Sequence, residues 1–359
     1  MSPFPVSADH AVRYLVRAAI TAPSPYNTQP WRFVGSGDEL QLHADPARRL
    51  AVADPDGREM VISCGAALFN LRLAVRHLGF LPRVQVFPDA ARPWHLATVR
   101  WGPYVPPSAA EESLFACRAH RHTHRGPFQP DPLSLGFVRE LRHLAPQEGA
   151  ELHTVSDSRT LRELSVLIRA AETARRAHPA FSSELANWTP PSRSGRFDGI
   201  PGHAYPRIPD TTAFAGRDYA GHARMGYADG IPARCVRPTL GLVTLLDTCH
   251  DRPADWLRAG QGLQFVLLYA AAHRVRVAFH TQPLELPELR QEVRRSTVTA
   301  GWPQVILRLG HAGGGARATP RRAVDDVLSR SAVPGVRVHG ATGRGPMAHA
   351  GSRVRQENY

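Results

Sequence analysis

Arg121, Thr123 and Arg125, near the middle of the chain, have types and spacing that suit an anionic ligand. They alternate with His122 and His124 and precede a Gly-Pro turn signal, so they belong to a connection between regular elements. Guanidinium groups form charge-assisted, often bidentate hydrogen bonds to phosphate oxygens. The pattern therefore predicts a phosphate contact, and an exposed basic turn is the alternative.

The histidines of the same segment do not favour a metal site. His120, His122 and His124 recur at every second residue, and no carboxylate stands beside them. A zinc site needs several ligands that converge on one point. We expect no bound metal.

Residues 22–31 form a second candidate site. Three prolines and an asparagine within ten residues exclude a continuous helix and leave backbone groups free to meet a partner. Ser24, Asn27 and Gln29 add short polar side chains, and Trp31 can anchor the segment in a core. The segment is either a ligand-contacting loop or a proline-stiffened connection.

Hydrophobic periodicity indicates the elements that must position these segments. It predicts helices over residues 9–20, 111–119, 132–144, 158–177 and 259–270. It also predicts a long helix that opens from the turn at 54–59 and runs through 64–74 to 78, with Gly79 as C-cap. It predicts strands over residues 31–34, 40–43, 95–101, 150–155, 240–246 and 304–309. Residues 178–238 show no periodicity and are expected to form a lid or an insertion. We expect residues 329–359 to be a mobile tail.

Two long apolar helices suggest an internal repeat. Residues 64–74 and 260–270 share spacing and small-residue placement, and a basic turn and an extended segment follow each of them. Any two buried helices can look alike, which is the alternative. A real repeat implies a monomer that imitates a dimer, with its two central helices packed together.

The amino-acid composition excludes lysine chemistry and bears on whether the protein binds nucleic acid. The chain of 359 residues has 43% hydrophobic residues and a net charge of +13, and all 44 cationic side chains are arginine. Without lysine, Schiff-base chemistry is excluded, and a phosphate contact must come from arginine, histidine or backbone. The arginines are scattered among acids and no nucleic-acid-binding motif is present, so codon bias explains the charge better than nucleic-acid binding.

Targeting signals and cysteines point to a reducing compartment. No apolar run approaches the roughly 20 residues of a membrane span, and no secretion signal is visible, so we expect a cytoplasmic protein. Cys64, Cys117, Cys235 and Cys249 form no C-x-x-C pair and are expected to be core thiols.

The two candidate sites together resemble the nitroreductase family of FMN enzymes. Pro-Ser-x-x-Asn-x-Gln-Pro-Trp at 23–31 resembles its flavin-contacting loop, and Arg-His-Thr-x-Arg at 121–125 resembles its Arg-x-Ser-x-Arg/Lys signature for the ribityl phosphate and pyrimidine edge. The resemblance implies FMN contacts from Pro23, Ser24, Asn27, Gln29, Arg121, His122, Thr123 and Arg125. Arg121 and Thr123 would meet the phosphate, and Arg125 would lie near N1 and the C2 carbonyl.

Two further segments resemble the same family. Thr-Gln-Pro-Leu-Glu at 281–285 resembles the segment whose backbone N–H meets flavin N5, which implies contacts from Pro283, Leu284 and Glu285, the last two as donors. Pro-Arg-Arg at 320–322 resembles the C-terminal basic pair and implies that Arg321 and Arg322 join the phosphate site. No acid–base residue stands out, and Tyr205, Tyr219 and Tyr227 are weak candidates.

Residues 8–328 are most similar to the Acg branch, in which two nitroreductase-like halves are fused. The resemblance rests on the motifs at 54–59, 187–189 with 198–201, 255–261, 282–285 and 319–322. It implies an α+β nitroreductase fold with halves at 1–118 and 119–328, a lid insertion at about 178–238 and one FMN per monomeric pseudo-dimer. In that branch the segment like 187–201 covers the flavin, and a physiological substrate is generally not settled.

The leading function implied is an FMN-dependent oxidoreductase. NAD(P)H would reduce the flavin, and a small electron-poor acceptor of nitro, quinone or ene type would reoxidise it. One alternative is a non-catalytic protein that sequesters FMN beneath the lid. Another is a pathway-specific flavin dehydrogenase reduced by its own substrate. We expect no nucleic-acid or membrane partner.

Overall fold

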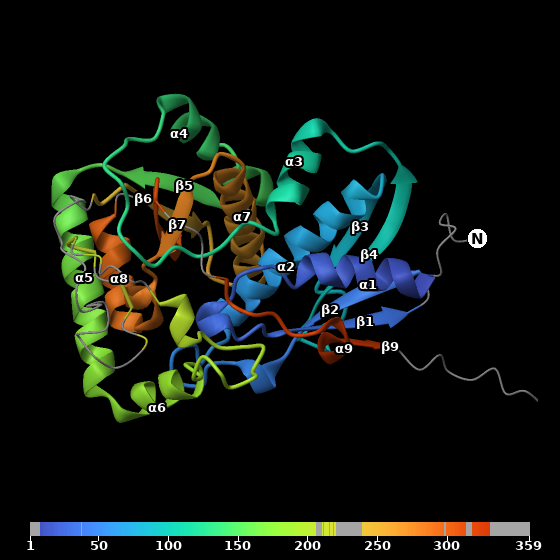
Figure 1. The fold of residues 1–359 in the computed structure, drawn as a ribbon, viewed down its shortest axis with the longest axis horizontal. Coiled ribbons are helices and arrows are strands. Elements are labelled where there is room, and N and C mark those ends of the chain that lie inside the picture. The colour runs from blue at the N-terminus through green and yellow to red at the C-terminus, as the bar shows by residue number, and fades with distance from the viewer. Residues whose placement is uncertain are drawn as a thin grey trace, which may run out of the picture.

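The computed structural model describes residues 8–36, 38–205, 210, 212–214, 216–217, 219, 239–297, 299–313 and 318–330. Two long helices, α2 (Arg58–His77) and α7 (Pro253–Ala272), pack against each other at the centre. One sheet lies beside α2 and a second beside α7 (Figure 1). The described residues therefore form an α+β fold, as expected.

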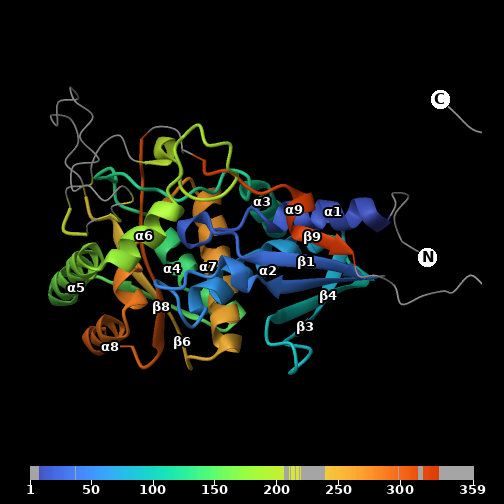
Figure 2. The same cartoon turned by 90° about the horizontal axis from the view of Figure 1, so that it is seen from below.

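The first sheet has the strand order β3-β4-β2-β1-β9. Its strands are β1 (Trp31–Ser36), β2 (Glu39–Ala44), β3 (Phe80–Val86), β4 (His95–Tyr104) and β9 (Leu328–Arg330). All pairs are antiparallel except β1 with β9, which run parallel with Phe33 opposite Leu328. Figure 2 shows β9 beside β1. The end of the chain thus completes the sheet that its beginning forms.

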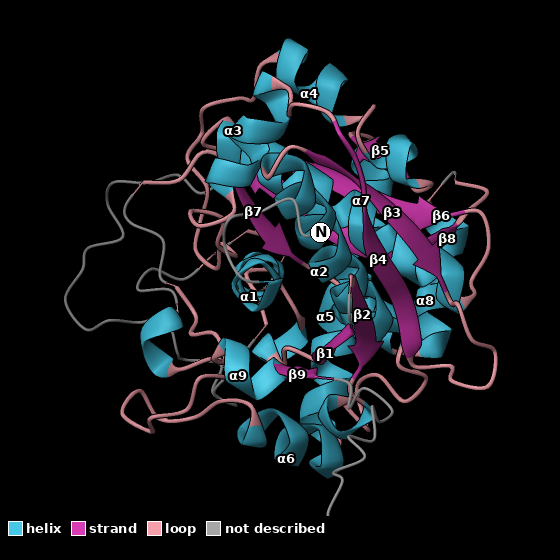
Figure 3. Ribbon diagram, turned by 90° about the vertical axis from the view of Figure 1, so that its right-hand side faces the viewer, coloured by secondary structure: helices cyan, strands magenta, loops and turns pink. Residues whose placement is uncertain are grey.

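The second sheet has the order β5-β6-β8-β7 and is antiparallel throughout. Its strands are β5 (Glu151–Val155), β6 (Leu242–Thr248), β7 (Arg276–Phe279) and β8 (Trp302–Gly310). The remaining helices are α1 (Ala8–Ala19), α3 (Ala109–Cys117), α4 (Leu135–Leu141), α5 (Ser158–Ala177), α6 (Pro179–Asn187), α8 (Pro287–Ser296) and α9 (Val324–Val327). Figure 3 shows β2, β3 and β4 alongside α2.

Glycine lets the two central helices approach closely. A Cβ on Gly65 would lie 2.3 Å from the carbonyl oxygen of Leu257, and a Cβ on Gly260 would lie 2.0 Å from that of Ile62. Real Cβ atoms do not approach an oxygen so closely, so these positions require glycine while the helices keep this separation. Both residues belong to the segments that the sequence singled out as similar.

Most predicted elements are present, and the exceptions have local causes. Helix α6 lies inside the stretch expected to be irregular, and Pro179 at its first turn is tolerated there. Helix α4 is shorter than expected because Ser134 caps it by accepting from the Phe137 N–H. Strand β3 ends in exposed residues, so its periodicity was weak. The expected tail begins two residues too early, since Ser329 and Arg330 pair with β1.

The cysteine expectation holds only in part. Cys64 is fully buried, Cys117 is half-buried and Cys249 is exposed, while Cys235 lies outside the described residues. Only the first is thus a core thiol, and burial raises its pKa. In the described part of the chain, the helices are all too short or too polar to cross a membrane.

Candidate functional site

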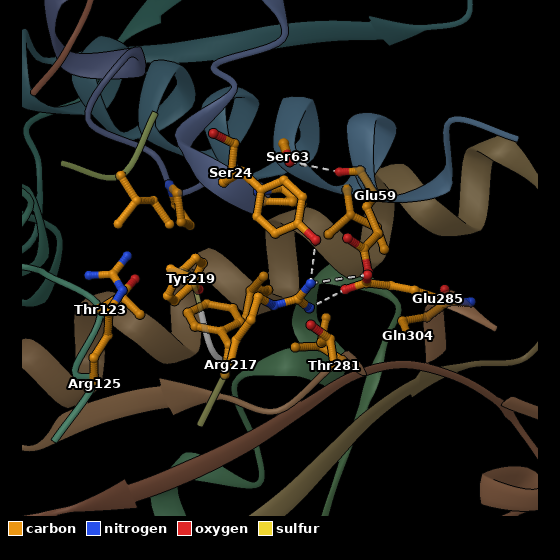
Figure 4. Close-up of a pocket in the computed structure, with 18 residues that line it drawn as sticks. Ser24, Glu59, Ser63, Thr123, Arg125, Arg217, Tyr219, Thr281, Glu285 and Gln304 are labelled. Atoms are coloured by element: carbon orange, nitrogen blue, oxygen red, sulfur yellow. Dashed lines mark hydrogen bonds and ion pairs between the residues drawn. The ribbon is translucent and has the colours of Figure 1, made fainter. Parts of the chain in front are cut away.

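One candidate site is a cavity, here called the central cavity, with about 730 Å³ of empty space that opens to solvent. The loop before β1, helix α2, the 121–125 segment, the 281–285 segment and the lid insertion all line it. Figure 4 shows Thr123 and Arg125 toward one side and Glu285 and Gln304 toward the other, with Arg217 between them. The tertiary structure therefore brings the separate sequence motifs to one place.

A smaller cavity of about 320 Å³, here called the basic cavity, adjoins the central cavity. Pro23, Ser24, Thr123 and Arg125 line both cavities, so the two are adjacent. The lining of the basic cavity is completed by Asn27, Arg121, His122, Thr319 and Arg321. An elongated ligand with one anionic end fits this arrangement.

The basic cavity concentrates positive charge, and its described lining includes no carboxylate. Arg121 is only 6% exposed, and its Nε and Nη1 have no hydrogen-bond partner among the described residues. Burial, and then the charges of Arg321 and Arg125, lower its pKa to about 9. Burial and Arg125 likewise lower the pKa of Arg321 to about 10. No ion pair within the described residues involves these three arginines, so their charges are buried without a carboxylate partner there.

His122 stays neutral in this environment. Burial and then Arg121 lower its pKa to about 4, with Arg321, Arg276 and His120 adding to the effect. A neutral imidazole can donate one hydrogen bond to an anion without adding charge. The described residues contain no cluster of His, Cys, Asp and Glu that could hold a metal ion.

Asn27 joins three parts of the chain at the edge of the basic cavity. Its Nδ2 donates to the carbonyl oxygens of Gly199 and Pro320, both at 3.0 Å. Its Oδ1 accepts from Arg321 Nη1 at 3.1 Å. Asn27 therefore links the loop, the lid insertion and the C-terminal basic pair, and it aligns one guanidinium of the cavity.

Gln29 and Arg322 lie outside both cavities. The Gln29 side chain is completely buried, donates to Phe197 O at 2.8 Å and accepts from the Arg322 N–H at 2.9 Å. Arg322 donates to Gln29 O and to Asp326 O. In this structure Gln29 fastens the lid insertion to the loop, and Arg321 rather than Arg322 reaches the basic cavity.

Only some residues of the 281–285 segment line the central cavity. Thr281 and Glu285 line the central cavity, whereas Pro283 and Leu284 are buried and do not. The Leu284 N–H already donates to Thr281 O at 2.8 Å within a 3-10 turn. The structure therefore gives no support to Leu284 as a free backbone donor.

Several residues that line the central cavity were not predicted as site residues from the sequence. Glu59 and Ser63 come from α2, and Gln304 comes from β8. Arg58 ties these elements together, because its Nη1 donates to Gln304 O at 2.9 Å and its Nη2 donates to Leu284 O. The helix-start pattern at 54–59 was the available signal for α2, but it did not show which face would meet the cavity.

A buried ionic cluster borders the central cavity. Glu285 forms ion pairs with Arg175 and Arg217. The Tyr26 hydroxyl accepts from Arg175 Nη1 at 3.3 Å and from Arg217 Nη1, a contact drawn in Figure 4. Tyr26 has a positive φ of 49°, a conformation unusual for a bulky residue. The strained turn directs this ring into the wall of the cavity.

The lid insertion is anchored over the cavity at several points. Glu184 of α6 accepts from the Val52 and Ala53 N–H groups at 3.0 and 2.9 Å. Asp198 forms an ion pair with Arg48. Ile200, which follows, is buried and lines the central cavity. Of the three lid tyrosines, Tyr219 lines the cavity, Tyr205 does not, and Tyr227 lies outside the described residues.

Comparison with known proteins identifies relatives along most of the chain. Rv3131 of Mycobacterium tuberculosis H37Rv, provisionally named an NAD(P)H nitroreductase, is 34% identical over 88% of this chain and 90% of its own length. The acg protein of the same strain, provisionally named likewise, is 28% identical over 88% of this chain and 95% of its own length. An uncharacterised protein, Rv3127, is 32% identical over 89% of this chain and 93% of its own length.

Solved structures give a weaker likeness. A nitroreductase with bound FMN from Desulfitobacterium hafniense is 13% identical and covers 60% of this chain and 97% of its own, with a TM-score of 0.38. NfnB from Mycobacterium smegmatis, solved with NADPH, is 18% identical over 66% of this chain and 100% of its own, with a TM-score of 0.34. These scores are too low to carry an argument about the site. No family model matches the chain.

Proposed function

This chain belongs to the nitroreductase family, and we propose that it binds FMN and transfers electrons from NAD(P)H to a small electron-poor acceptor of nitro, quinone or ene type. The observation that carries this proposal is the group of buried arginines in the basic cavity, which lack a counter-charge among the described residues. A bound phosphate would accept hydrogen bonds from these arginines, and its negative charge would offset the cost of burying their positive charges.

The residues present fit the proposed cofactor. Arg121, Arg321 and Thr123 would hold the phosphate, with Ser24 and His122 beside it. Arg125 lines both cavities and would place a fixed cation at the start of the central cavity, where it stabilises negative charge on a ring system. Bound FMN would supply a ring that accepts hydride and passes electrons to an acceptor.

The chain's other contribution is to exclude water. Ile200 and the Tyr26 ring border the central cavity with apolar surface. The bonds from Asn27 and Gln29 to residues 197–199 hold the lid insertion at this border. A drier site strengthens the interaction of Arg125 with charge on the ligand.

The decisive experiment is an anaerobic titration of the purified, FMN-loaded protein with NADPH, followed by flavin absorbance. We expect the oxidised band to bleach and to return when a nitroaromatic or quinone acceptor is added. A bound flavin that NADPH and NADH both fail to reduce would contradict the proposal. Failure to bind FMN after reconstitution would overturn the cofactor assignment as well.

A second candidate function is sequestration of FMN without turnover. It is favoured by the lid insertion, since Ile200, Arg217 and Tyr219 all line the central cavity and Asn27 is bonded to the lid. A flavin held beneath such a cover would be shielded from nicotinamide. In the same titration, this function gives tight FMN binding and no bleaching.

We further propose that residues 1–118 and 119–328 form two related halves that act as a pseudo-dimer with one FMN. The support is that each half contributes a sheet and one long central helix, and that these helices cross at Gly65 and Gly260. The phosphate residues come from the second half and the loop from the first. A flavin-to-protein ratio of one for a monomer in solution is the expected result, and a ratio of two would contradict it.

A further inference from the structure

Asn27 contacts the basic cavity and the lid insertion at the same time. It is 5% exposed and lines the basic cavity together with Arg321. Its Nδ2 donates to Gly199 O at 3.0 Å, and its backbone carbonyl oxygen accepts from the Gly199 N–H at 3.3 Å. One residue of the 22–31 loop therefore bonds both polar backbone groups of one lid residue.

The surroundings of the Asn27 side-chain amide fix its orientation. Oδ1 accepts from Arg321 Nη1 at 3.1 Å, and Nδ2 donates to the carbonyl oxygens of Gly199 and Pro320. The reverse orientation would turn Nδ2 toward a cation and Oδ1 toward two carbonyl oxygens. Because an amide accepts at its oxygen and donates at its nitrogen, the Arg321 contact keeps the donor side turned toward the lid.

The position of Arg321 depends on charge in the basic cavity. Within the described residues its guanidinium donates to neutral groups, which include Thr319 Oγ1 at 2.9 Å and Ala22 O at 3.3 Å, and its Nε has no partner there. Burial and then the charge of Arg125 lower its pKa to about 10. An anion in the basic cavity would therefore stabilise Arg321 where it now lies.

Two other contacts hold the lid insertion without passing through the basic cavity. Gln29 accepts from the Arg322 N–H at 2.9 Å and donates to Phe197 O at 2.8 Å. Arg48 forms an ion pair with Asp198. Neither Gln29 nor Arg48 lines the basic cavity, so these contacts hold the lid whether or not an anion is bound there. Asn27 differs from them because it touches the cavity.

We propose that Asn27 is a positioning residue that couples anion binding in the basic cavity to closure of the lid insertion. The anion stabilises Arg321, Arg321 orients the Asn27 amide, and the amide donates to Gly199. Ile200 follows Gly199 and lines the central cavity, so the same step closes apolar surface over that cavity. That the anion is the phosphate of FMN rests on the proposed function. The coupling then distinguishes a phosphorylated flavin from one without phosphate.

Hydrogen exchange of the full-length, FMN-free protein tests the coupling, with inorganic phosphate as the probe. The described lining of the basic cavity includes no lid residue, so phosphate there cannot shield the lid by direct contact. The readout is exchange in peptides that contain Gly199 and Ile200, whose N–H groups donate to Asn27 O and Trp188 O. At constant ionic strength, saturating phosphate should slow this exchange about fivefold, the order expected of one hydrogen bond.

Two results for the wild type would overturn the proposal. One is lid exchange that saturating phosphate leaves unchanged. The other is an equal slowing of exchange in α4, which lines neither cavity, because phosphate would then act on the whole fold.

Variants locate the effect at Asn27. Asn27→Gly removes the side-chain amide and keeps the backbone, because Asn27 has a φ of 56° that glycine adopts readily. Its lid should exchange faster than that of the wild type, and phosphate should no longer slow the exchange. Arg48→Gln, the matched control, breaks the ion pair with Asp198. It should speed lid exchange with and without phosphate alike, so that the ratio stays at the wild-type value.

The ratio of the exchange rates with and without phosphate decides the outcome. A wild-type ratio in Asn27→Gly would contradict the proposal, and so would loss of the ratio in Arg48→Gln, because the effect would then not depend on Asn27.

Calorimetric titration with phosphate separates this proposal from the proposed function. Phosphate that binds the wild type but leaves lid exchange unchanged overturns the coupling and leaves the anion site in place. Phosphate that does not bind overturns both the coupling and the anion site. Reduction by NADPH enters neither measurement, so a bound flavin that NADPH fails to reduce contradicts the proposed oxidoreductase function alone.

Discussion

One arginine cluster lines the basic cavity and another borders the central cavity, and they differ in their counter-charges. Arg121 and Arg321 in the basic cavity form no ion pair with a described carboxylate, and each has a guanidinium nitrogen without a partner among the described residues. Arg175 and Arg217 are paired with the buried carboxylate of Glu285. The first cluster is incomplete without an anion, whereas the second is largely satisfied by the protein itself.

Because of this difference, we expect substitutions in the first cluster to affect ligand binding and substitutions in the second to affect folding stability. In the first cluster, folding buries charge that only a ligand can compensate, so its residues should matter most for ligand affinity. In the second cluster, the carboxylate compensates the arginines in the free protein, so its loss should matter most for folding. Residue type alone does not distinguish these cases, because both clusters are built from arginine.

The largest expected effect is on cofactor binding. Arg121→Ala combined with Arg321→Ala should weaken FMN binding by at least about a hundredfold, since each hydrogen bond to a charged group contributes about 1.5–3 kcal/mol. The dissociation constant is measured by quenching of FMN fluorescence. Arg322→Ala, outside the cavity, is the control and should change the constant less than about threefold. A double variant that purifies with full flavin would refute the assignment.

The second effect is on stability. Glu285→Gln leaves Arg175 and Arg217 buried without their carboxylate and should lower the free energy of unfolding by about 3–5 kcal/mol. Urea unfolding of the FMN-free protein measures the change. Glu288→Gln, on the exposed side of α8, should change it by less than about 0.5 kcal/mol. Equal effects of the two substitutions would show that the cluster is not a stabilising one.

An acidic pair near the central cavity should give a smaller, pH-dependent effect. Asp54 accepts from the Glu59 and Met60 N–H groups, and burial, followed by the charge of Glu59, raises its pKa to about 6. Its stabilising contribution is therefore present below about pH 4 and is lost as the pH rises toward 6, because the folded protein holds the proton more tightly.

Asp54→Asn removes this titration. The free energy of unfolding of the wild type, relative to that of Asp54→Asn, should fall by roughly 2 kcal/mol as the pH rises from about 4 to about 6. This estimate uses about 1.4 kcal/mol per unit of pKa. Urea unfolding at a series of pH values checks this. A difference that is constant over the range would show that Asp54 ionises normally.

The smallest expected effect uses phosphate as a probe of the first cluster. Inorganic phosphate at a few times its Kd should stabilise the FMN-free wild type by about 1 kcal/mol. The same addition should leave the stability of Arg121→Ala unchanged, whereas it should stabilise Arg169→Ala, on α5, as much as the wild type. Thermal unfolding at constant ionic strength measures this, and an equal response of Arg121→Ala would place the anion elsewhere.

The sequence alone was sufficient for features that depend on near neighbours. Helix α5 has the predicted bounds, and Gly79 follows α2 with a φ of 87°. Both follow from local rules, namely the 3.6-residue period and the left-handed conformation that glycine adopts readily. The family also follows from motifs, because the motifs quoted for the resemblance span the chain and the relatives cover most of it.

Only the tertiary structure decided which residues of each motif face a cavity. The adjacent residues Arg321 and Arg322 look equivalent in sequence, but the backbone directs one to the basic cavity and the other to Gln29 and Asp326. Similarly, Asn27 lines the basic cavity, whereas Gln29 is buried and binds the lid insertion through Phe197 O.

The same limit explains the contacts that sequence reasoning did not predict. Arg217, Glu285 and Tyr26 meet although they are far apart in the chain, and Arg175 joins them from the end of α5. Periodicity and motifs report spacing along the chain, whereas a buried cluster depends on contacts between distant elements. The sequence therefore determined most of the elements, the family and the residue types of the site, and tertiary packing decided which side chains converge.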